Sequence, residues 1–184
     1  LGQTLRTGVG TDVTTATTIT AATWNNLMLN IKDCWDNRFS PASRTVSTPS
    51  SVTRATAWTS SLTEETTFTW ASEGACRGYF NAGGRIGFSS SRTGGSATTQ
   101  NTNWASLLSS MADVFLTHDD TICTGSTGTI AGLGFYELTT TYQQLYVKFG
   151  SGAYASNFFK VEGKVDSITN PTVVTLRATY SDPY

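Results

Sequence analysis

The stretch FKVEGKVD, residues 159–166, alternates strictly between two kinds of side chain. Its odd-numbered positions are Phe, Val, Gly and Val, and its even-numbered positions are Lys, Glu, Lys and Asp. Successive side chains of a β-strand point to opposite faces, so this pattern predicts a strand with one face on a core and one in water. Antiparallel sheets with one solvated face show this alternation.

The same period of two recurs along the second part of the chain, at residues 66–71, 85–89, 145–149 and 174–180. Gly, Ser and Asn turns separate these runs, and Asn170-Pro171 is the turn signal before the last one. Several half-buried strands joined by such turns are typical of two packed antiparallel sheets. The sequence therefore predicts a mainly β fold, an antiparallel β-sandwich of jelly-roll-like type.

Two segments show a helical period instead. Large apolar residues stand at offsets 0, 3, 4, 7 and 11 in residues 19–35, namely Trp24, Leu27, Met28, Ile31 and Trp35. This is one face of an amphipathic helix, with Thr20 as its expected N-cap. Residues 101–111 repeat offsets 0, 3, 4 and 7, with Asn101 or Thr102 as the cap, and predict one helix inserted among the strands.

Residues 40–56 carry two prolines and many Ser and Thr residues among few large apolar ones, which is typical of a connector. We therefore expect two parts. Residues 1–56 would form an N-terminal arm, the amphipathic helix and a linker that provide attachment and oligomer contacts. Residues 57–184 would form the β-sandwich domain.

Composition limits the functions that fit. Of the 184 residues only 14% are charged, the net charge is −1, and 54 are Thr or Ser. Weakly charged, Thr-rich strands suit a surface that packs against copies or neighbours. The chain has no basic cluster for nucleic acid and no apolar run long enough for a membrane span. We expect neither of these partners, and no cofactor.

Cys34, Cys76 and Cys123 are far apart and lack the spacing of a zinc site. We expect them to be small buried hydrophobes in a protein that folds in a reducing cytoplasm. Because the sequence begins with Leu1, we also expect that the natural start is processed or lies outside this sequence.

The segment GYFNAGGRIGFSSSRTGG, residues 78–95, contains six glycines but neither GxxxxGK[ST] nor GxGxxG. It therefore lacks the loop that cradles a phosphate. Residues 81–84 and 92–95 are expected to form turns, in which glycine supplies a positive φ.

His118-Asp119-Asp120 is the one cluster suggestive of a site. Its simplest interpretation is a polar loop after the second helix. Catalysis with Thr121 or Cys123, or a bound cation, are the alternatives. Glu64, Glu65 and Glu73 form a sparse acidic patch, and its simplest interpretation is likewise a polar surface without a functional site. No catalytic, cofactor-binding or metal-binding residue is predicted.

The aromatic residues leave a second hypothesis open. Trp24, Trp70 and Trp104 lie on predicted helix or strand faces, so we expect burial. The tyrosines nearer turns and the C-terminus could stack on sugars: Tyr136, Tyr142, Tyr154, Tyr180 and Tyr184. A polysaccharide hydrolase would instead need two carboxylates about 5 to 9.5 Å apart, drawn from Glu64, Glu65, Glu73, Asp119, Asp120 and Glu137.

Two runs carry a resemblance to a known class of protein. FNAGGRIGFSSSRTGG followed by QNTNW, and Y followed by GSGAYASNFFKVEGK, resemble virion structural proteins of tailed bacteriophages, particularly tail, fibre or baseplate-associated components. The likeness covers most of residues 17–184. It implies a non-enzymatic, multi-copy building block of the virion, assembled in the host cytoplasm, whose partners are its own copies and other virion proteins. It transfers no site residues. A receptor- or glycan-binding fibre-tip module is the alternative.

Overall fold

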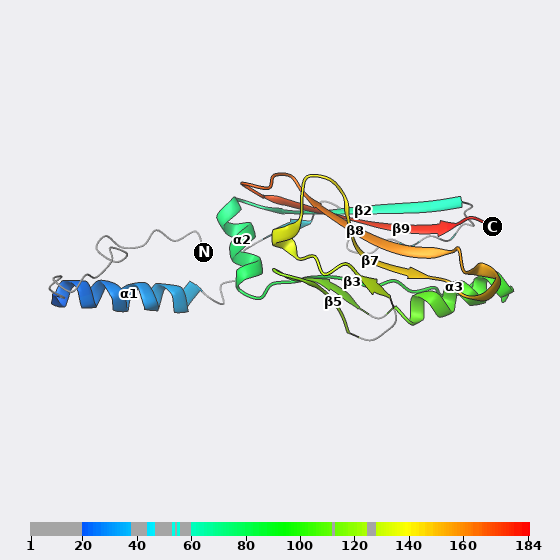
Figure 1. Cartoon of the computed structure of the whole chain (residues 1–184), viewed down its shortest axis with the longest axis horizontal. Coiled ribbons are helices and arrows are strands. Elements are labelled where there is room, and N and C mark those ends of the chain that lie inside the picture. The colour runs from blue at the N-terminus through cyan, green and yellow to red at the C-terminus, as the bar shows by residue number, and fades with distance from the viewer. Residues whose placement is uncertain are drawn as a thin grey trace.

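The structure, a computed structural model, describes residues 20–37, 44–46, 53, 55, 60–111, 113–124 and 128–184. The predicted arm over residues 1–18 and most of the predicted connector lie outside these residues. Figure 1 shows the described elements along the long axis of the molecule, with the strands and two of the helices grouped together and helix α1 to one side.

The larger sheet contains six strands in the order β1-β2-β9-β8-β7-β6, and all neighbours are antiparallel. Strands β7, β8 and β9 follow one another in the chain and in the sheet, an up-and-down order that the alternation did not specify. The bounds are Arg44–Val46 for β1, Ser60–Trp70 for β2, Thr129–Ile130 for β6, Gln143–Phe149 for β7, Phe158–Val165 for β8 and Val173–Asp182 for β9. Strand β1 lies inside the segment predicted to be a connector.

The smaller sheet contains β3 (Ile86–Phe88), β4 (Val114–Leu116) and β5 (Thr121–Cys123), also antiparallel. In Figure 1 it lies in a different layer from β2, β8 and β9. One buried apolar cluster contains side chains of both sheets, including Leu116 and Val161. The predicted mainly β, antiparallel architecture is thus confirmed, and the two sheets are compatible with a β-sandwich.

Strand β8 faces the core as its alternation predicts. Phe159, Val161 and Val165 are at most 3% exposed, and they stand opposite Tyr180, Ala178 and Val174 of β9. Gly163 belongs to the same inward row, and a Cβ built on it would lie 2.9 Å from a methyl of Leu145. The glycine therefore leaves space for its core neighbour.

Two helices, rather than the one predicted, are inserted among the strands. Helix α2 (Glu73–Asn81) was missed, and Ser72 caps it by accepting from Ala75 N. Helix α3 (Thr99–Ser109) is the predicted helix, but its N-cap is Thr98 rather than Asn101 or Thr102. Two 3-10 turns, η1 (Phe135–Glu137) and η2 (Gly152–Tyr154), complete the described helical elements.

Helix α1 (Ala21–Asn37) confirms the prediction for residues 19–35, and Thr20 O accepts from Trp24 N at its start. The expected burial of Trp24 is wrong, because its side chain is 58% exposed. Trp70 and Trp104, at 2% and 5%, are buried as predicted.

The glycine-rich segment forms turns, as expected. Gly83, Gly94 and Gly95 have φ of +84°, +76° and +81°, a conformation that side chains disfavour. Gly84 serves a different purpose, since a Cβ there would lie 2.4 Å from Tyr79 O. The turn at residues 81–84 therefore closes helix α2 against the chain entering β3.

Candidate functional site

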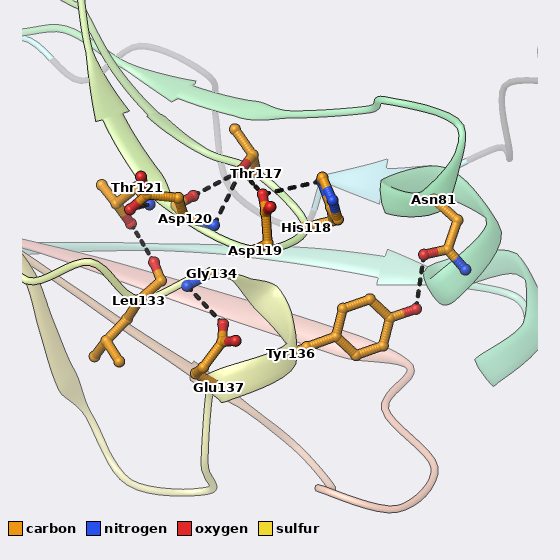
Figure 2. Close-up of polar contacts among 10 residues, drawn as sticks. All are labelled: Asn81, Thr117, His118, Asp119, Asp120, Thr121, Leu133, Gly134, Tyr136 and Glu137. Carbon is orange, nitrogen blue, oxygen red and sulfur yellow. Dashed lines mark hydrogen bonds and ion pairs between the residues drawn. The ribbon is translucent and has the colours of Figure 1, made fainter.

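His118, Asp119 and Asp120 occupy the hairpin turn between β4 and β5 (Figure 2). The predicted polar loop is therefore confirmed, with strand β4 between it and the second predicted helix. The turn is built from its own side chains: Thr117 Oγ1 donates to Asp120 O at 2.8 Å, and Asp120 Oδ1 accepts from Thr121 N at 2.7 Å. His118 Nδ1 lies 3.2 Å from Asp119 Oδ1, and both side chains are more than half exposed. These contacts are those of a tight turn.

The neighbouring turn η1 uses its polar groups in the same way. Glu137 Oε2 accepts from Gly134 N at 2.8 Å, and Thr121 Oγ1 donates to Leu133 O at 2.6 Å (Figure 2). A Cβ on Gly134 would lie 2.3 Å from the Asp119 carbonyl carbon, so the two turns pack backbone to backbone. This packing holds the His118 turn in place.

No three His, Cys, Asp or Glu side chains of the described residues gather as metal ligands would. Thr121 is 1% exposed and committed to Leu133, whereas a nucleophile must reach its substrate. Cys123 Sγ contacts Met111 O at 3.1 Å. The structure thus places the turn of His118, Asp119 and Asp120 beside the η1 turn of Glu137. The three carboxylates accept hydrogen bonds from groups of their own turns.

The acidic residues singled out in the sequence are dispersed. Glu64 and Glu65 are successive residues of β2 and point to opposite faces of the sheet. Glu73 lies in the first turn of α2, where a carboxylate favours the helix dipole, and it pairs with Arg77. Glu64, Glu65 and Glu73 therefore lie on two faces of one strand and in a helix, and the predicted acidic patch is not formed.

A charged row crosses the outer face of the larger sheet, where Glu65, Arg177 and Glu162 are neighbours in register on β2, β9 and β8. Glu162 is 8% exposed and accepts from Arg177 Nη2 at 2.8 Å and Lys160 Nζ at 2.9 Å. Burial acts to raise the Glu162 pKa, but these two cations outweigh it and hold the pKa below its usual value.

Tyr142 covers this row. Its hydroxyl donates to Glu65 Oε1 at 2.7 Å, and the Arg177 guanidinium lies 3.7 Å from its ring centroid. Burial, followed by the Glu65 hydrogen bond, raises the Tyr142 pKa to about 12. Tyr142 therefore connects the loop before β7 to the outer face of the sheet through Glu65 and Arg177.

The other tyrosines near turns differ in exposure. Tyr136 is 43% exposed, and its hydroxyl donates to Asn81 Oδ1 at 2.9 Å (Figure 2). Tyr180 is half-buried, and its hydroxyl lies 2.8 Å from Ser90 Oγ. Tyr154 and Tyr184 meet edge to face at 5.4 Å, and Tyr184 is 59% exposed. Only part of this set is available for stacking on a sugar.

The cysteines fit the sequence prediction in part. Cys76 is fully buried, and burial followed by Asp166 raises its pKa to about 12. Cys123 is a half-buried thiol. The side chain of Cys34 lies outside the described residues.

Asp182, which sequence reasoning missed, is the centre of a buried polar cluster. It is 7% exposed, and its oxygens accept from Gln100 Nε2 at 2.8 and 2.7 Å and from Trp104 Nε1 at 3.1 Å. The Asn157 amide, turned so that its nitrogen faces Asp182, donates at 3.1 Å and accepts from Trp104 at 3.1 Å. The available signal was an acidic residue at an inward position of the last strand.

An open pocket of about 170 Å³ lies between α3 and the turn that follows β7. Lys148 reaches into this region and donates to Ser110 O at 3.0 Å, at the C-cap of α3. Burial lowers the Lys148 pKa. Phe149, 56% exposed, is part of the pocket wall. Hydroxyl, amide, amine and aromatic groups therefore surround a small concave surface.

No helix within the described residues is both long and apolar enough to cross a membrane. Comparison with known proteins adds no relative: no family model, no curated protein and no solved structure matches this chain.

Proposed function

We propose that this chain is a non-enzymatic structural protein of a tailed bacteriophage virion, present in several copies as a tail, fibre or baseplate-associated component. The proposal begins from the two runs that resemble such proteins. One observation carries it: side chains from both runs converge on the Asp182 carboxylate.

Gln100 and Trp104 come from the QNTNW run, and Asn157 comes from the GSGAYASNFF run. Together they fix the end of β9 to α3 and to the end of the β7–β8 connection. A buried carboxylate with several donors is costly to leave unpaired, so this arrangement specifies one packing of three distant segments. The residues that carry the resemblance thus act on the scaffold.

The glycines of the first run support the same role. Gly84 allows the close approach to Tyr79, and a Cβ on Gly87 would lie 2.8 Å from the Phe115 ring. The carboxylates of the His118 turn and of η1 accept from their own backbone. Local stabilisation accounts for the polar residues that first suggested chemistry.

Immunogold labelling tests this proposal. Antibodies against residues 60–184 would be applied to tailed particles purified from the phage that encodes the chain. We expect label at repeated positions on the tail, fibres or baseplate. Chain that remains entirely in the particle-free fraction of the lysate would refute a structural role, and catalytic turnover of a polysaccharide would refute the non-enzymatic assignment.

A receptor- or glycan-binding module is a second candidate, favoured by the pocket beside Phe149. An exposed aromatic ring next to Asn103, Ser106 and Lys148 offers both stacking and hydrogen bonds to a saccharide. A glycan array with the whole chain tests it, with Phe149→Ala as the binding variant and Ile168→Ala, an equally exposed apolar residue, as the control. Binding that only Phe149→Ala abolishes would support it, and an array without a hit would refute it.

A further inference from the structure

We infer that helix α1 joins copies of this chain to one another, through a bundle of identical helices that bury Trp24, Leu27, Met28 and Ile31, here called the apolar stripe. The inference rests on the proposed function for its multi-copy setting and names the partner: further copies of the same helix.

The apolar stripe is exposed in the single chain. Its four side chains are 58%, 38%, 48% and 53% exposed, in the order given above. Figure 1 shows α1 lying apart from the sheets and the other helices. Helix α3 and the turn that ends it have large apolar residues at the same offsets of 0, 3, 4 and 7, and all four are at most 6% exposed: Trp104, Leu107, Leu108 and, just beyond the helix, Met111. The two helices thus have the same spacing, but among the residues that the structure describes it is α3 that buries its stripe against its own chain.

Helix α1 has little to stabilise it alone. It contains 17 residues, no acidic residue in its first turn and no basic residue in its last turn, and Asn25, Asn26 and Asn30 are weak helix formers. Isolated helices shorter than about 12 to 15 residues are marginal in water even with good helix formers, α1 is only slightly longer, and most helix stability in proteins comes from burying an apolar face. The apolar stripe of α1 is exposed, so the helix lacks the stabilisation that burial of this face would give.

Charge favours a second copy as the occupant. Identical faces that meet also bring identical charges together, and the apolar stripe carries none. At helical spacing, the charged positions 33 and 36 fall on other sides of α1, and Lys32, four residues after Met28, borders the stripe without lying in it. A symmetric contact between copies therefore brings no charge into the seam itself and leaves Lys32 at its edge.

The two sheets with helices α2 and α3, here called the β-body, show no continuous apolar face among their described residues that could cover the apolar stripe. Its exposed large hydrophobic residues belong to separate elements and loops: Ile122, Ile130, Tyr136, Phe149, Ile168 and Tyr184. The apolar stripe, in contrast, is continuous along two turns of one helix. Its best complement among the described surfaces is another copy of itself.

Spacing and area favour more than two helices. Trp24, Leu27 and Ile31 follow the 3.5-residue repeat of a coiled-coil seam, and Met28 widens the stripe on one side. At about 200 Å² for each large side chain, the exposed fractions leave roughly 400 Å² of apolar surface per helix. This is about half of what one partner buries in a standard interface, so a pair would be weak. In a bundle of three or more copies, each helix has two neighbours.

Two matched substitutions test the inference in the full chain. Leu27→Glu places a charge in the apolar stripe, and Leu29→Glu places the same charge on the other side of the same helix. The two leucines are 38% and 40% exposed, so exposure and helix propensity are matched. The readout is molar mass by light scattering, from about 1 to about 100 µM chain.

We expect the unchanged chain and Leu29→Glu to reach a mass of three or more copies, and Leu27→Glu to need at least about tenfold higher concentration for the same mass. Circular dichroism on the same samples reports whether each variant keeps its β-body. A strictly monomeric unchanged chain, equal weakening by both substitutions, or a monomer that binds another virion protein through α1 would overturn the inference. Immunogold label on particles would survive each of these outcomes, so the proposed function fails independently.

Discussion

Replacing Asp182 by alanine should destabilise the β-body more than any loss of a surface charge. The carboxylate is 7% exposed and takes hydrogen bonds from Gln100, Trp104 and Asn157. In the Asp182→Ala variant, Trp104 can still donate to the Asn157 oxygen, and the half-buried Gln100 amide can donate to water instead. The fully buried Asn157 nitrogen, however, loses its acceptor. Leaving a buried donor unpaired costs about 1–3 kcal/mol, and losing hydrogen bonds to a charged group costs a similar amount, which gives a total of about 3 kcal/mol.

Urea unfolding followed by tryptophan fluorescence measures this loss. With a slope of about 2 kcal/mol/M for a domain of this size, the midpoint should fall by about 1.5 M. Asp113→Ala, which removes an exposed aspartate, is the control and should change the stability by less than about 0.5 kcal/mol. Asp182→Asn, which keeps one acceptor, should fall between the two. An Asp182→Ala midpoint no lower than that of Asp113→Ala would refute the role given to the cluster.

Three further predictions concern the scaffold. Glu162→Gln should cost about 1–2 kcal/mol at pH 7, because it removes the charge that Lys160 and Arg177 face. Because the pKa of Glu162 is lower in the folded than in the unfolded chain, its charge stabilises the fold fully above the unfolded pKa, and this stabilisation is lost as pH falls through the folded pKa. Urea unfolding at about pH 3 should therefore show a smaller stability difference between the unchanged chain and Glu162→Gln than at pH 7. An unchanged difference would contradict this role of the Glu162 charge. Gly84→Ala should destabilise by about 1–3 kcal/mol against the Tyr79 carbonyl, whereas Gly78→Ala, in open space within α2, should be neutral or stabilising in the same assay. In a chain with Cys34 and Cys123 changed to serine, the Cys76 thiol, whose pKa is about 12, should react with iodoacetamide only after denaturation, and rapid reaction in the folded chain would disprove its burial.

The strands could be predicted because their signal is local. In β8 and β9 the buried apolar residues alternate along the strand, and burial on one face imposes a period of two on the sequence. In β7 four successive residues are buried, from Leu145 to Lys148, although its sequence also alternates. Helices α1 and α3 were predictable for the same reason, with a period of 3.6. Their different burial was not, because equal spacing at Trp24 and Trp104 does not show whether the same chain supplies a partner for the face.

Helix α2 was missed because its sequence, EGACRGYFN, is short and contains two glycines and two aromatic residues, which are weak helix formers. Burial of Cys76, Tyr79 and Phe80 outweighs that propensity. Strand β4, between α3 and the His118 turn, was not predicted because it is only three residues long. A strand of that length shows no clear alternation.

The Asp182 cluster depended on contacts between distant segments. Trp104 and Asp182 are 78 residues apart in the chain, and no local pattern links a tryptophan in α3 to an aspartate at the end of β9. The inward register of Asp182 was visible beside Val174 and Leu176, but alternation alone does not identify which groups satisfy an inward carboxylate. Gln100, Trp104 and Asn157 lie in the two runs that carry the resemblance, but their physical role could be assigned only from the structure.

We propose that several copies of this chain form part of a virion and meet through α1. A cryo-electron microscopy reconstruction of the assembled particle would show both the copies and their contacts. We predict repeated copies of the β-body arranged around a shared bundle of α1 helices, with Trp24, Leu27, Met28 and Ile31 inside the bundle. A single copy per particle, or α1 packed against the sheets of its own chain, would show that copies do not meet through this helix.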